Sequence, residues 1–219
     1  MSAQMKAGAP VTGAAAEDAA AQHYHGGVVD DIMVVGVGGQ GVIVAAAVIA
    51  DTAMLHGGLD VKLSETRGMS QRGGSVNSHI RIGETVVAPS ISPGEVDYLL
   101  AFEMAEGLRA APSVVPGGVA IVNTQQIVPP LASQGDMSNP FDAVERMAQG
   151  DRRVIVVDGN GIAQEVGDLK VAGIVLVGAL STHLPFDVDM WRAAIVRNVP
   201  PKWKDLNFAA FAAGREVGA

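Results

Sequence analysis

Residues 32–50 read IMVVGVGGQGVIVAAAVIA, which is an apolar run, a glycine-rich turn and a longer apolar run. The β-branched run before the turn predicts a buried strand, and the unbroken apolar run after it predicts a helix. A glycine-rich turn between a strand and a helix is the setting in which backbone N–H groups at a helix N-terminus bind phosphate. The stretch therefore predicts an α/β domain with a ligand site at the turn Gly36–Gly41.

The rest of the chain continues the alternation of strands and helices. Strands or extended segments are predicted at 31–36, 60–65, 75–82, 85–88, 96–102, 118–123 and 153–157. Helices are predicted at 42–56, 103–111, 141–149, 161–166, 170–183, 188–198 and 202–216. This order indicates a Rossmann-like single domain with a central, mostly parallel sheet, helices on both faces, and C-terminal helices packed on the body.

The chain of 219 residues is 48% hydrophobic and 17% charged, which is typical of one compact domain. A net charge of −8 argues against a nucleic-acid-binding surface, because such a surface needs clustered Lys and Arg. The sequence has no cysteine, which excludes disulfides, thiolate metal sites and Cys-ligated iron–sulfur clusters within this chain. Any redox centre must then be held by a partner.

Residues 1–27 are rich in Ala and Gly and predict a flexible leader, followed by one domain over 28–219. A short helix over Thr12–Gln22 is the alternative for the leader. The leader lacks the basic start and continuous apolar core of a signal peptide. The longest apolar stretch, Val171–Leu180, is shorter than the roughly twenty residues of a membrane span and predicts a buried core helix. We predict a cytoplasmic protein with no membrane partner.

The glycines of the first turn have distinct expected roles. Gly36 would permit a tight bend, Gly38 would let the backbone approach a ligand, and Gly41 would let helix and strand pack. Glu65 lies roughly where an acid would bind the ribose of a dinucleotide, so a free-standing NAD- or flavin-dependent oxidoreductase is an alternative. A turn that serves packing alone also stays open.

A second motif, residues 65–76, reads ETRGMSQRGGSV. Arg67 and Arg72 can pair with phosphate or with carboxylates of a partner, because the guanidinium fork favours bidentate contact. The glycines of this motif allow close approaches that side chains would block. The alternative is a solvated hairpin loop whose arginines face water.

The sequence shows no nucleophile elbow and no HExxH metal motif. His79 and His183 are predicted as core or interface residues, and His23 and His25 lack a third metal ligand. We therefore predict neither a catalytic residue nor a metal site in this chain.

Five segments resemble the gamma-type subunits of 2-oxoacid:ferredoxin (acceptor) oxidoreductases, and among them the beta subunit of indolepyruvate ferredoxin oxidoreductase. They are GVGGQGV at 36–42, ETRGMSQRGGSV at 65–76, SHIRIG at 78–83, DYLLAFE at 97–103 and NFAAFAAG at 207–214. The resemblance covers residues 31 to about 216, and its most specific element is the run 68–74.

The resemblance implies a complex that oxidatively decarboxylates an aryl 2-oxoacid, such as indolepyruvate or phenylglyoxylate, to an acyl-CoA. Ferredoxin or another acceptor would take the electrons. Thiamine diphosphate, Mg and [4Fe-4S] clusters would lie on companion subunits, and this chain would supply a coenzyme A-side or interface domain. The implied cofactor-binding residues are Gly36, Gly38, Gly39, Gln40 and Gly41 on one wall, and Arg67, Ser70, Gln71, Arg72, Gly73 and Gly74 on the other. A purely structural role, in which the glycines only permit subunit packing, is a further alternative.

Overall fold

The computed structural model describes residues 30–68, 74–127, 142–148 and 151–218. In this part of the chain, six strands form one sheet in the order β2-β3-β1-β4-β5-β6. The strands are β1 (Asp30–Val37), β2 (Asp60–Arg67), β3 (Ser75–Gly83), β4 (Val96–Ala101), β5 (Val114–Asn123) and β6 (Arg153–Val157). The helices are α1 (Val42–His56), α2 (Met104–Ala110), α4 (Ala143–Ala148), α5 (Gly159–Val166), α6 (Ala172–Leu180), α7 (Val188–Asn198) and α8 (Lys204–Gly218). Short 3-10 turns, η2 (Ala111–Ser113), η3 (Leu169–Val171) and η4 (Pro201–Trp203), precede β5, α6 and α8.

The sheet is mixed but mostly parallel, as predicted. β1, β4, β5 and β6 pair in parallel, whereas β3 pairs antiparallel with both β1 and β2. Parallel pairing brings the carboxyl ends of β1, β4, β5 and β6 to one edge of the sheet. The end of β2 and the start of β3 lie at the same edge, because Val37 at the end of β1 faces Ser75 and Arg67 faces Val76.

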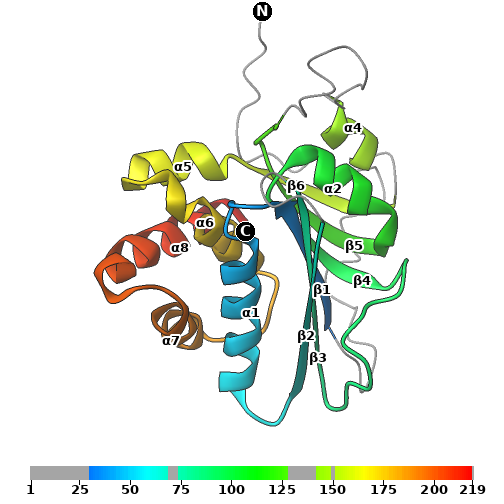
Figure 1. Cartoon of the computed structure of the whole chain (residues 1–219), viewed down its shortest axis with the longest axis horizontal. Helices are drawn as coiled ribbons and strands as arrows, with labels where there is room; N and C mark the ends of the chain where they lie inside the picture. Colours follow the sequence, from blue (N-terminus) through cyan, green and yellow to red (C-terminus); the bar gives the residue numbers. More distant parts are fainter. Residues whose placement is uncertain (1–29, 69–73, 128–141, 149–150, 219) are drawn as a thin grey trace, which may run out of the picture.

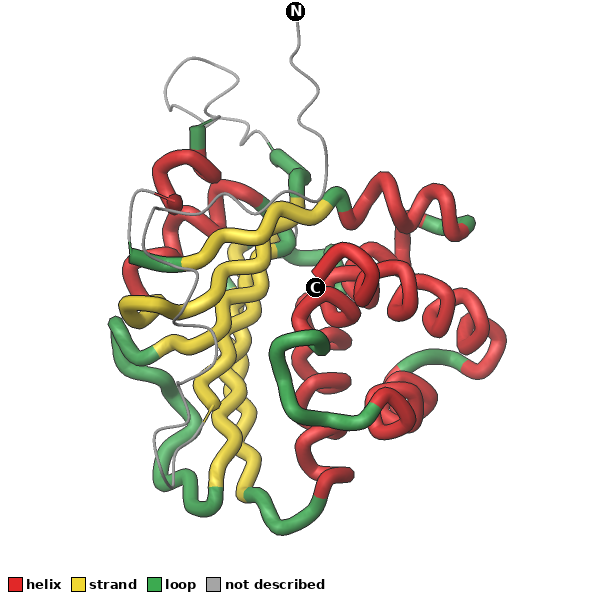
Figure 2. Tube along the Cα trace, turned by 180° about the vertical axis from the view of Figure 1, so that it is seen from behind, coloured by secondary structure: helices red, strands yellow, loops and turns green. Residues whose placement is uncertain are grey.

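Helices cover both faces of the sheet, as Figures 1 and 2 show. Alternate strand residues divide the core, because successive side chains point to opposite faces. Ile32 and Val34 pack with α1, α6, α7 and α8, whereas Met33 and Val35 pack with α2 and α4. The first face carries the larger hydrophobic cluster and every helix after residue 158.

Helix α6 is apolar on all sides, and it forms the central helix of that larger layer. Every residue from Gly173 to Leu180 is buried, which confirms the predicted core helix. Gly178 on α6 and Gly214 on α8 have no room for a β-carbon, which would strike the backbone of the opposite helix. The glycines therefore permit unusually close packing of the two helices. None of the described helices is long and apolar enough to cross a lipid bilayer.

One predicted strand is wrong. Residues 85–88 form no strand, and they lie in the loop between β3 and β4. The reason is topological: β3 already has strand partners on both sides, so no free edge remains beside it for another strand. The loop folds back on the sheet instead, where Ile91 N donates to His79 Nδ1 at 3.0 Å and Arg81 Nη1 donates to Ser90 O at 3.2 Å.

Most other predicted elements lie within two residues of the observed ones. Strand β5 starts at Val114, four residues earlier than predicted, and the helix predicted at 170–183 is helical only over 172–180 after a 3-10 turn. The predicted leader, residues 1–27, lies outside the described residues, so the domain boundary at residue 28 stays a prediction.

Candidate functional site

The candidate site lies at the carboxyl edge of the sheet, between β1 and β4. From this point α1 passes to one face and α2 to the other, as seen in Figure 1. In open α/β sheets, this divergence leaves a crevice outside the strand ends, where ligands usually bind. The turn Gly36–Gly41 enters that crevice from β1.

The glycines of the turn are needed for reasons that differ from those predicted. A β-carbon on Gly36 would lie 2.8 Å from Phe102 Cβ and 2.8 Å from Gln40 Oε1, so Gly36 serves close packing. Gly39 and Gly41 have φ of 101° and 87°, a conformation that side chains disfavour, although space around them is open. Gly41 is therefore the residue that bends the chain, and Gly36 the one that lets the elements approach. Gly41 is the N-cap of α1, and no side chain caps it in the described part of the chain.

The two glycine motifs meet. Gly38 N donates to Gly74 O at 2.9 Å, and Gly68 N donates to Ser75 O at 2.8 Å. The end of the second motif therefore lies directly against the first turn. Because the Gly38 N–H binds Gly74, it is occupied within the protein.

Other predicted residues of the second motif cannot be placed. Ser70, Gln71, Arg72 and Gly73 lie outside the described residues. For Arg67 only the backbone is described, and it pairs with Val76 at the end of β2.

The side chain of Gln40 joins three strand ends. Its Oε1 accepts from Val37 N at 2.6 Å, while its Nε2 donates to Phe102 O at 3.2 Å and to Gln125 Oε1 at 2.8 Å. These partners follow or end β1, β4 and β5. The amide of Gln40 therefore fixes the turn against the sheet, and it acts on the site as a positioning group.

A second amide connects the neighbouring strand ends. Asn123 Nδ2 donates to Phe102 O and to Asn160 Oδ1, each at 3.1 Å, and Asn123 Oδ1 accepts from Gly159 N at 3.0 Å. Asn123, Gln125 and Asn160 were not predicted as site residues. Their position in the sequence could have identified them, because each is a polar residue at or just beyond the carboxyl end of a predicted strand.

On the other side of the crevice, the buried carboxylate of Glu103 binds two backbone N–H groups. Glu103, 1% exposed, accepts from Glu106 N at 2.9 Å and from Ile127 N at 3.0 Å, which caps α2 and fixes the chain after β5. Glu106 in turn accepts from Ser75 Oγ at 2.7 Å. This contact connects α2 to the end of the second glycine motif.

Two pockets open beside Gln40 and Gly41. One, of about 320 Å³, lies over the strand ends and is lined by amide side chains, including Asn123, Gln125 and Asn160. The other, of about 250 Å³, lies between the start of α1, α6 and the α7–α8 connection. Gln40, Gly41 and Lys170 line both pockets, so the pockets adjoin at the glycine turn.

His79 and His183, two of the three histidines within the domain, lie away from the glycine turn. Burial lowers the pKa of His79, whose Nδ1 accepts from Ile91 N, and His79 pairs with Met33 in the middle of β1. Burial also lowers the pKa of His183, in the α6–α7 connection. Across the described ranges, no group of three or more His, Asp or Glu could hold a metal ion.

Comparisons with known proteins give one consistent result. The family model for pyruvate ferredoxin/flavodoxin oxidoreductase matches residues 31–217. Indolepyruvate oxidoreductase subunit IorB of Archaeoglobus fulgidus is 38% identical over 188 residues, 84% of this chain and 92% of that protein.

Two solved structures share the fold. The crystal structure of the keto/oxoacid ferredoxin oxidoreductase gamma subunit from Geobacter sulfurreducens is 25% identical, with a TM-score of 0.64 over 86% of this chain and 97% of that one. The 2-oxoglutarate:ferredoxin oxidoreductase of Magnetococcus marinus, solved with 2-oxoglutarate, coenzyme A and succinyl-CoA bound, is 18% identical, with a TM-score of 0.66 over 87% of this chain and 31% of that one. The chain thus belongs to the pyruvate ferredoxin/flavodoxin oxidoreductase family, as a small subunit of a 2-oxoacid:ferredoxin oxidoreductase that is similar to the indolepyruvate oxidoreductase subunit IorB.

Proposed function

We propose that this chain is the coenzyme A-side domain of a cytoplasmic complex that oxidatively decarboxylates an aryl 2-oxoacid to an acyl-CoA. The aryl acid is an arylpyruvate such as indolepyruvate, or phenylglyoxylate. The substrate loses CO₂ and two electrons, its acyl group forms a thioester with coenzyme A, and ferredoxin or another acceptor takes the electrons. Thiamine diphosphate, Mg and [4Fe-4S] clusters belong to companion subunits, and no residue of this chain is assigned a chemical step.

The observation that carries the proposal is the contact between the two glycine motifs, at the 2.9 Å bond from Gly38 N to Gly74 O. It brings the arginine-bearing hairpin to the N-terminus of a 15-residue helix. The first N–H groups of such a helix have no partner within the helix and favour an anion. A phosphate of coenzyme A is such an anion, and the arginines of the hairpin would add charge from the opposite wall.

The free-standing dinucleotide enzyme has less support. Its ribose-binding acid should lie on the strand beside β1, but β3 separates β1 from β2. Glu65 pairs with Ser78, which in turn pairs with Val34, so Glu65 lies two strands from β1. At about 4.8 Å a strand, this places it roughly 10 Å to the side of the β1 turn.

The test is steady-state kinetics of the complex purified with its companion subunits. Arg72→Ala should raise the KM for coenzyme A about tenfold and change kcat less, because it removes binding that substrate and transition state share. Arg146→Ala is the matched control, since Arg146 lies on α4 with 51% of its side chain exposed and pairs with Asp142, and it should leave that KM unchanged.

Other results separate the alternatives. If Gly39→Ala and Arg72→Ala weaken subunit assembly while the assembled fraction keeps the normal KM for coenzyme A, the motifs serve subunit packing. An isolated chain that alone oxidises a substrate with NAD or flavin would overturn the proposal.

A further inference from the structure

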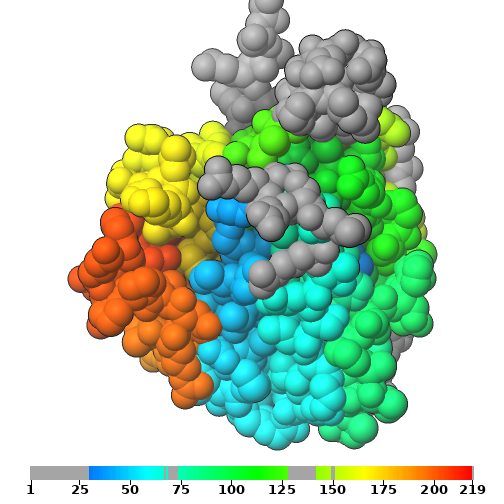
Figure 3. Space-filling model, in the orientation of Figure 1, coloured from blue at the N-terminus to red at the C-terminus, as the bar shows by residue number. Residues whose placement is uncertain are grey.

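The smaller pocket at the glycine turn has an apolar wall that remains open to solvent. Its lining includes Val44, Val171, Ile174, Val199 and Pro200, with Trp203 at one side. Val171 and Ile174 are buried within the fold, whereas Val44 is 40% exposed. Figure 3 shows α1 reaching the surface beside α7 and α8, the elements between which this pocket lies.

The two asparagine side chains that line the pocket form hydrogen bonds within the protein. Asn207 Nδ2 donates to Trp203 O at 2.7 Å, and Asn198 Nδ2 donates to Asp51 Oδ2 at 2.6 Å and to Ala194 O at 2.9 Å. A ligand in this pocket would therefore meet chiefly apolar surface. Such surface in a concave site is typical of small-molecule binding.

Trp203 is held at the pocket and is only half-buried. Its backbone N–H donates to Pro200 O at 2.9 Å, and its carbonyl accepts from the buried Asn207. The other tryptophan, Trp191, is 0% exposed and packs in the core. The indole ring lines the side of an open pocket, where it offers aromatic surface to a ligand.

Two lysines converge on this indole. Lys202 Nζ lies 5.3 Å and Lys170 Nζ 5.6 Å from the centre of the Trp203 ring. The nearest carboxylate to Lys170 is Asp168, at 3.9 Å, and the Lys170 side chain is 80% exposed, so this ion pair is weak. In the described part of the chain, no carboxylate pairs with Lys202. Lys170 lines the pocket and Lys202 lies beside its Trp203 wall, so two cations gather here on a protein whose net charge is −8.

We propose that this pocket binds a planar aromatic group that carries an anionic substituent. The ring lies against Trp203 and the apolar wall, and the anion binds the ammonium groups of Lys170 and Lys202. Whole-ligand pockets measure about 300–1,000 Å³. At about 250 Å³ the pocket suits an aromatic end group and not an entire cofactor.

Two sources have this chemistry. One is the nucleotide end of coenzyme A, and this choice rests on the proposed function. The other is an aryl 2-oxoacid or the corresponding aryl acid, which would bind independently of the coenzyme.

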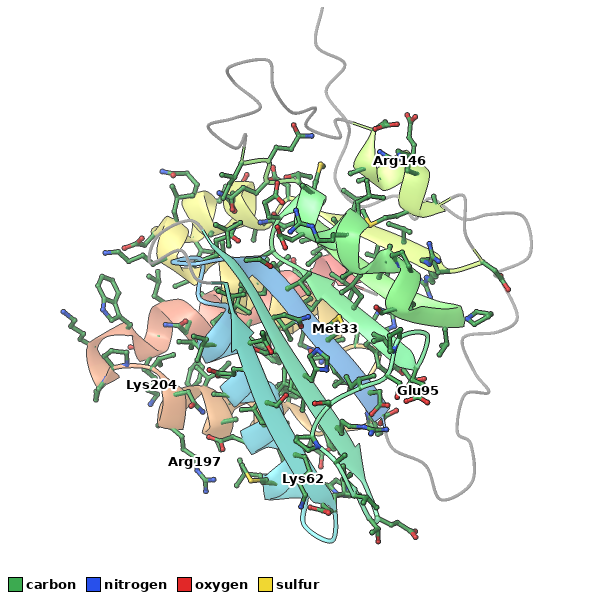
Figure 4. The ribbon with its side chains drawn as sticks, turned by 45° about the vertical axis from the view of Figure 1, so that its right-hand side comes forward. Met33, Lys62, Glu95, Arg146, Arg197 and Lys204 are labelled. Atoms are coloured by element: carbon green, nitrogen blue, oxygen red, sulfur yellow. The ribbon has the colours of Figure 1, made fainter. Side chains whose placement is uncertain are left out.

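The experiment titrates the full chain with adenosine 3′,5′-bisphosphate and, separately, with indole-3-acetate, by calorimetry. At least one probe should bind saturably, and K170A/K202A should weaken that binding at least tenfold. Lys204→Ala is the matched control, because Lys204 Nζ lies 5.5 Å from the centre of the Phe208 ring, whereas Lys170 and Lys202 lie over Trp203. Figure 4 shows Lys204 at the start of α8. Trp203→Leu should weaken binding of the same probe, while circular dichroism confirms that it folds.

The inference is overturned if neither probe binds saturably up to about 1 mM, or if Lys204→Ala weakens binding as much as the K170A/K202A pair. These results are distinct from failure of the proposed function. If Arg72→Ala raises the KM for coenzyme A but neither probe binds here, the function stands and the pocket assignment fails. If indole-3-acetate alone binds through Lys170 and Lys202, the pocket assignment stands whatever the role of coenzyme A.

Discussion

The two ends of the sheet are built from different chemistry. At the carboxyl edge, the neutral amides of Gln40 and Asn123 connect the strand ends and leave the glycine turn at the surface. At the amino edge, Arg81 forms a bidentate pair with Asp31, at 2.7 and 2.9 Å, and the β3–β4 loop folds over it. Figure 4 shows Glu95 of that loop far from Lys204 and Arg197. At the amino edge the buried Asp31 has its cation within the fold, whereas the carboxyl edge presents uncapped backbone at the start of α1.

The two edges therefore differ in whether they suit ligand binding or stability. A buried ion pair is costly to open, so the amino edge is suited to stability. The neutral amides of Gln40 and Asn123 fix the strand ends beside the glycine turn without adding negative charge of their own, so they suit a turn that receives an anion. Substitutions at the two edges should therefore separate stability from coenzyme binding.

The largest expected effect is at the amino edge. Arg81→Met leaves Asp31, 4% exposed, without its cation, so the free energy of unfolding should fall by about 3–5 kcal/mol. Denaturant unfolding at pH 7 measures this loss. The KM for coenzyme A of the complex that remains folded should not change, and a tenfold rise would contradict the separation of the two edges.

The next largest effect concerns Gln40. Gln40→Ala removes three hydrogen bonds and leaves Val37 N–H without its partner, which should cost about 2–3 kcal/mol. In contrast to Arg81→Met, it should also raise the KM for coenzyme A, because the turn loses its support. Gln40→Glu tests the positioning role, since the Oε1 bond to Val37 N can remain while donation to Phe102 O is lost. A variant that loses stability with an unchanged KM would restrict Gln40 to a structural role.

A smaller effect separates the glycines. Gly36→Ala introduces a β-carbon 2.8 Å from three neighbouring atoms and should cost about 1–3 kcal/mol by overpacking. Gly41→Ala meets open space and should cost about 1 kcal/mol, through its φ of 87° alone. The melting temperature of Gly36→Ala should therefore fall further than that of Gly41→Ala. The reverse order would show that backbone conformation, and not packing, decides the stability of the turn.

The smallest effect depends on pH. Burial, with Asp97 and Asp31 nearby, raises the pKa of Asp30 from 3.8 to about 6. Between these values the folded state binds more protons than the unfolded state, so the stability contribution of Asp30 falls as pH rises from about 4 to 6 and then stays low. Asp30→Asn should remove this slope and stabilise the protein at pH 7 by an amount on the order of 1 kcal/mol. Thermal unfolding from pH 4 to 8 measures it, and an unchanged slope would rule out Asp30 as its source.

The local sequence is enough to predict most elements of this fold. The run 32–50 has a strand, turn and helix pattern that tertiary contacts do not alter, and the apolar composition of α6 predicts its burial. The segment 85–88 was mispredicted because its β-branched residues, Thr85, Val86 and Val87, favour a strand, although Val87 is 95% exposed in the loop. Strand pairing is decided by the free edges of the sheet, which no local pattern contains.

The site was predictable only in part. Glycine spacing identifies the turn, and the contact between Gly38 and Gly74 agrees with the expected convergence of the motifs. The roles of Gly36 and Gly41 were exchanged, because space around a glycine depends on Phe102, 66 residues away from Gly36 in sequence. Asn123 and Gln125 lie at or just beyond the end of β5 and Lys170 lies just before α6, and only the packed fold brings these two segments to one edge.

Hydrogen–deuterium exchange on the purified complex, with and without coenzyme A, tests whether the two glycine motifs form one coenzyme-binding site. Peptides covering 36–45 and 65–76 should slow their exchange together when coenzyme A is added, while peptides covering Asp31 and Arg81 should not change. Unaltered exchange in both glycine motifs, in a complex that binds coenzyme A, would contradict a shared site.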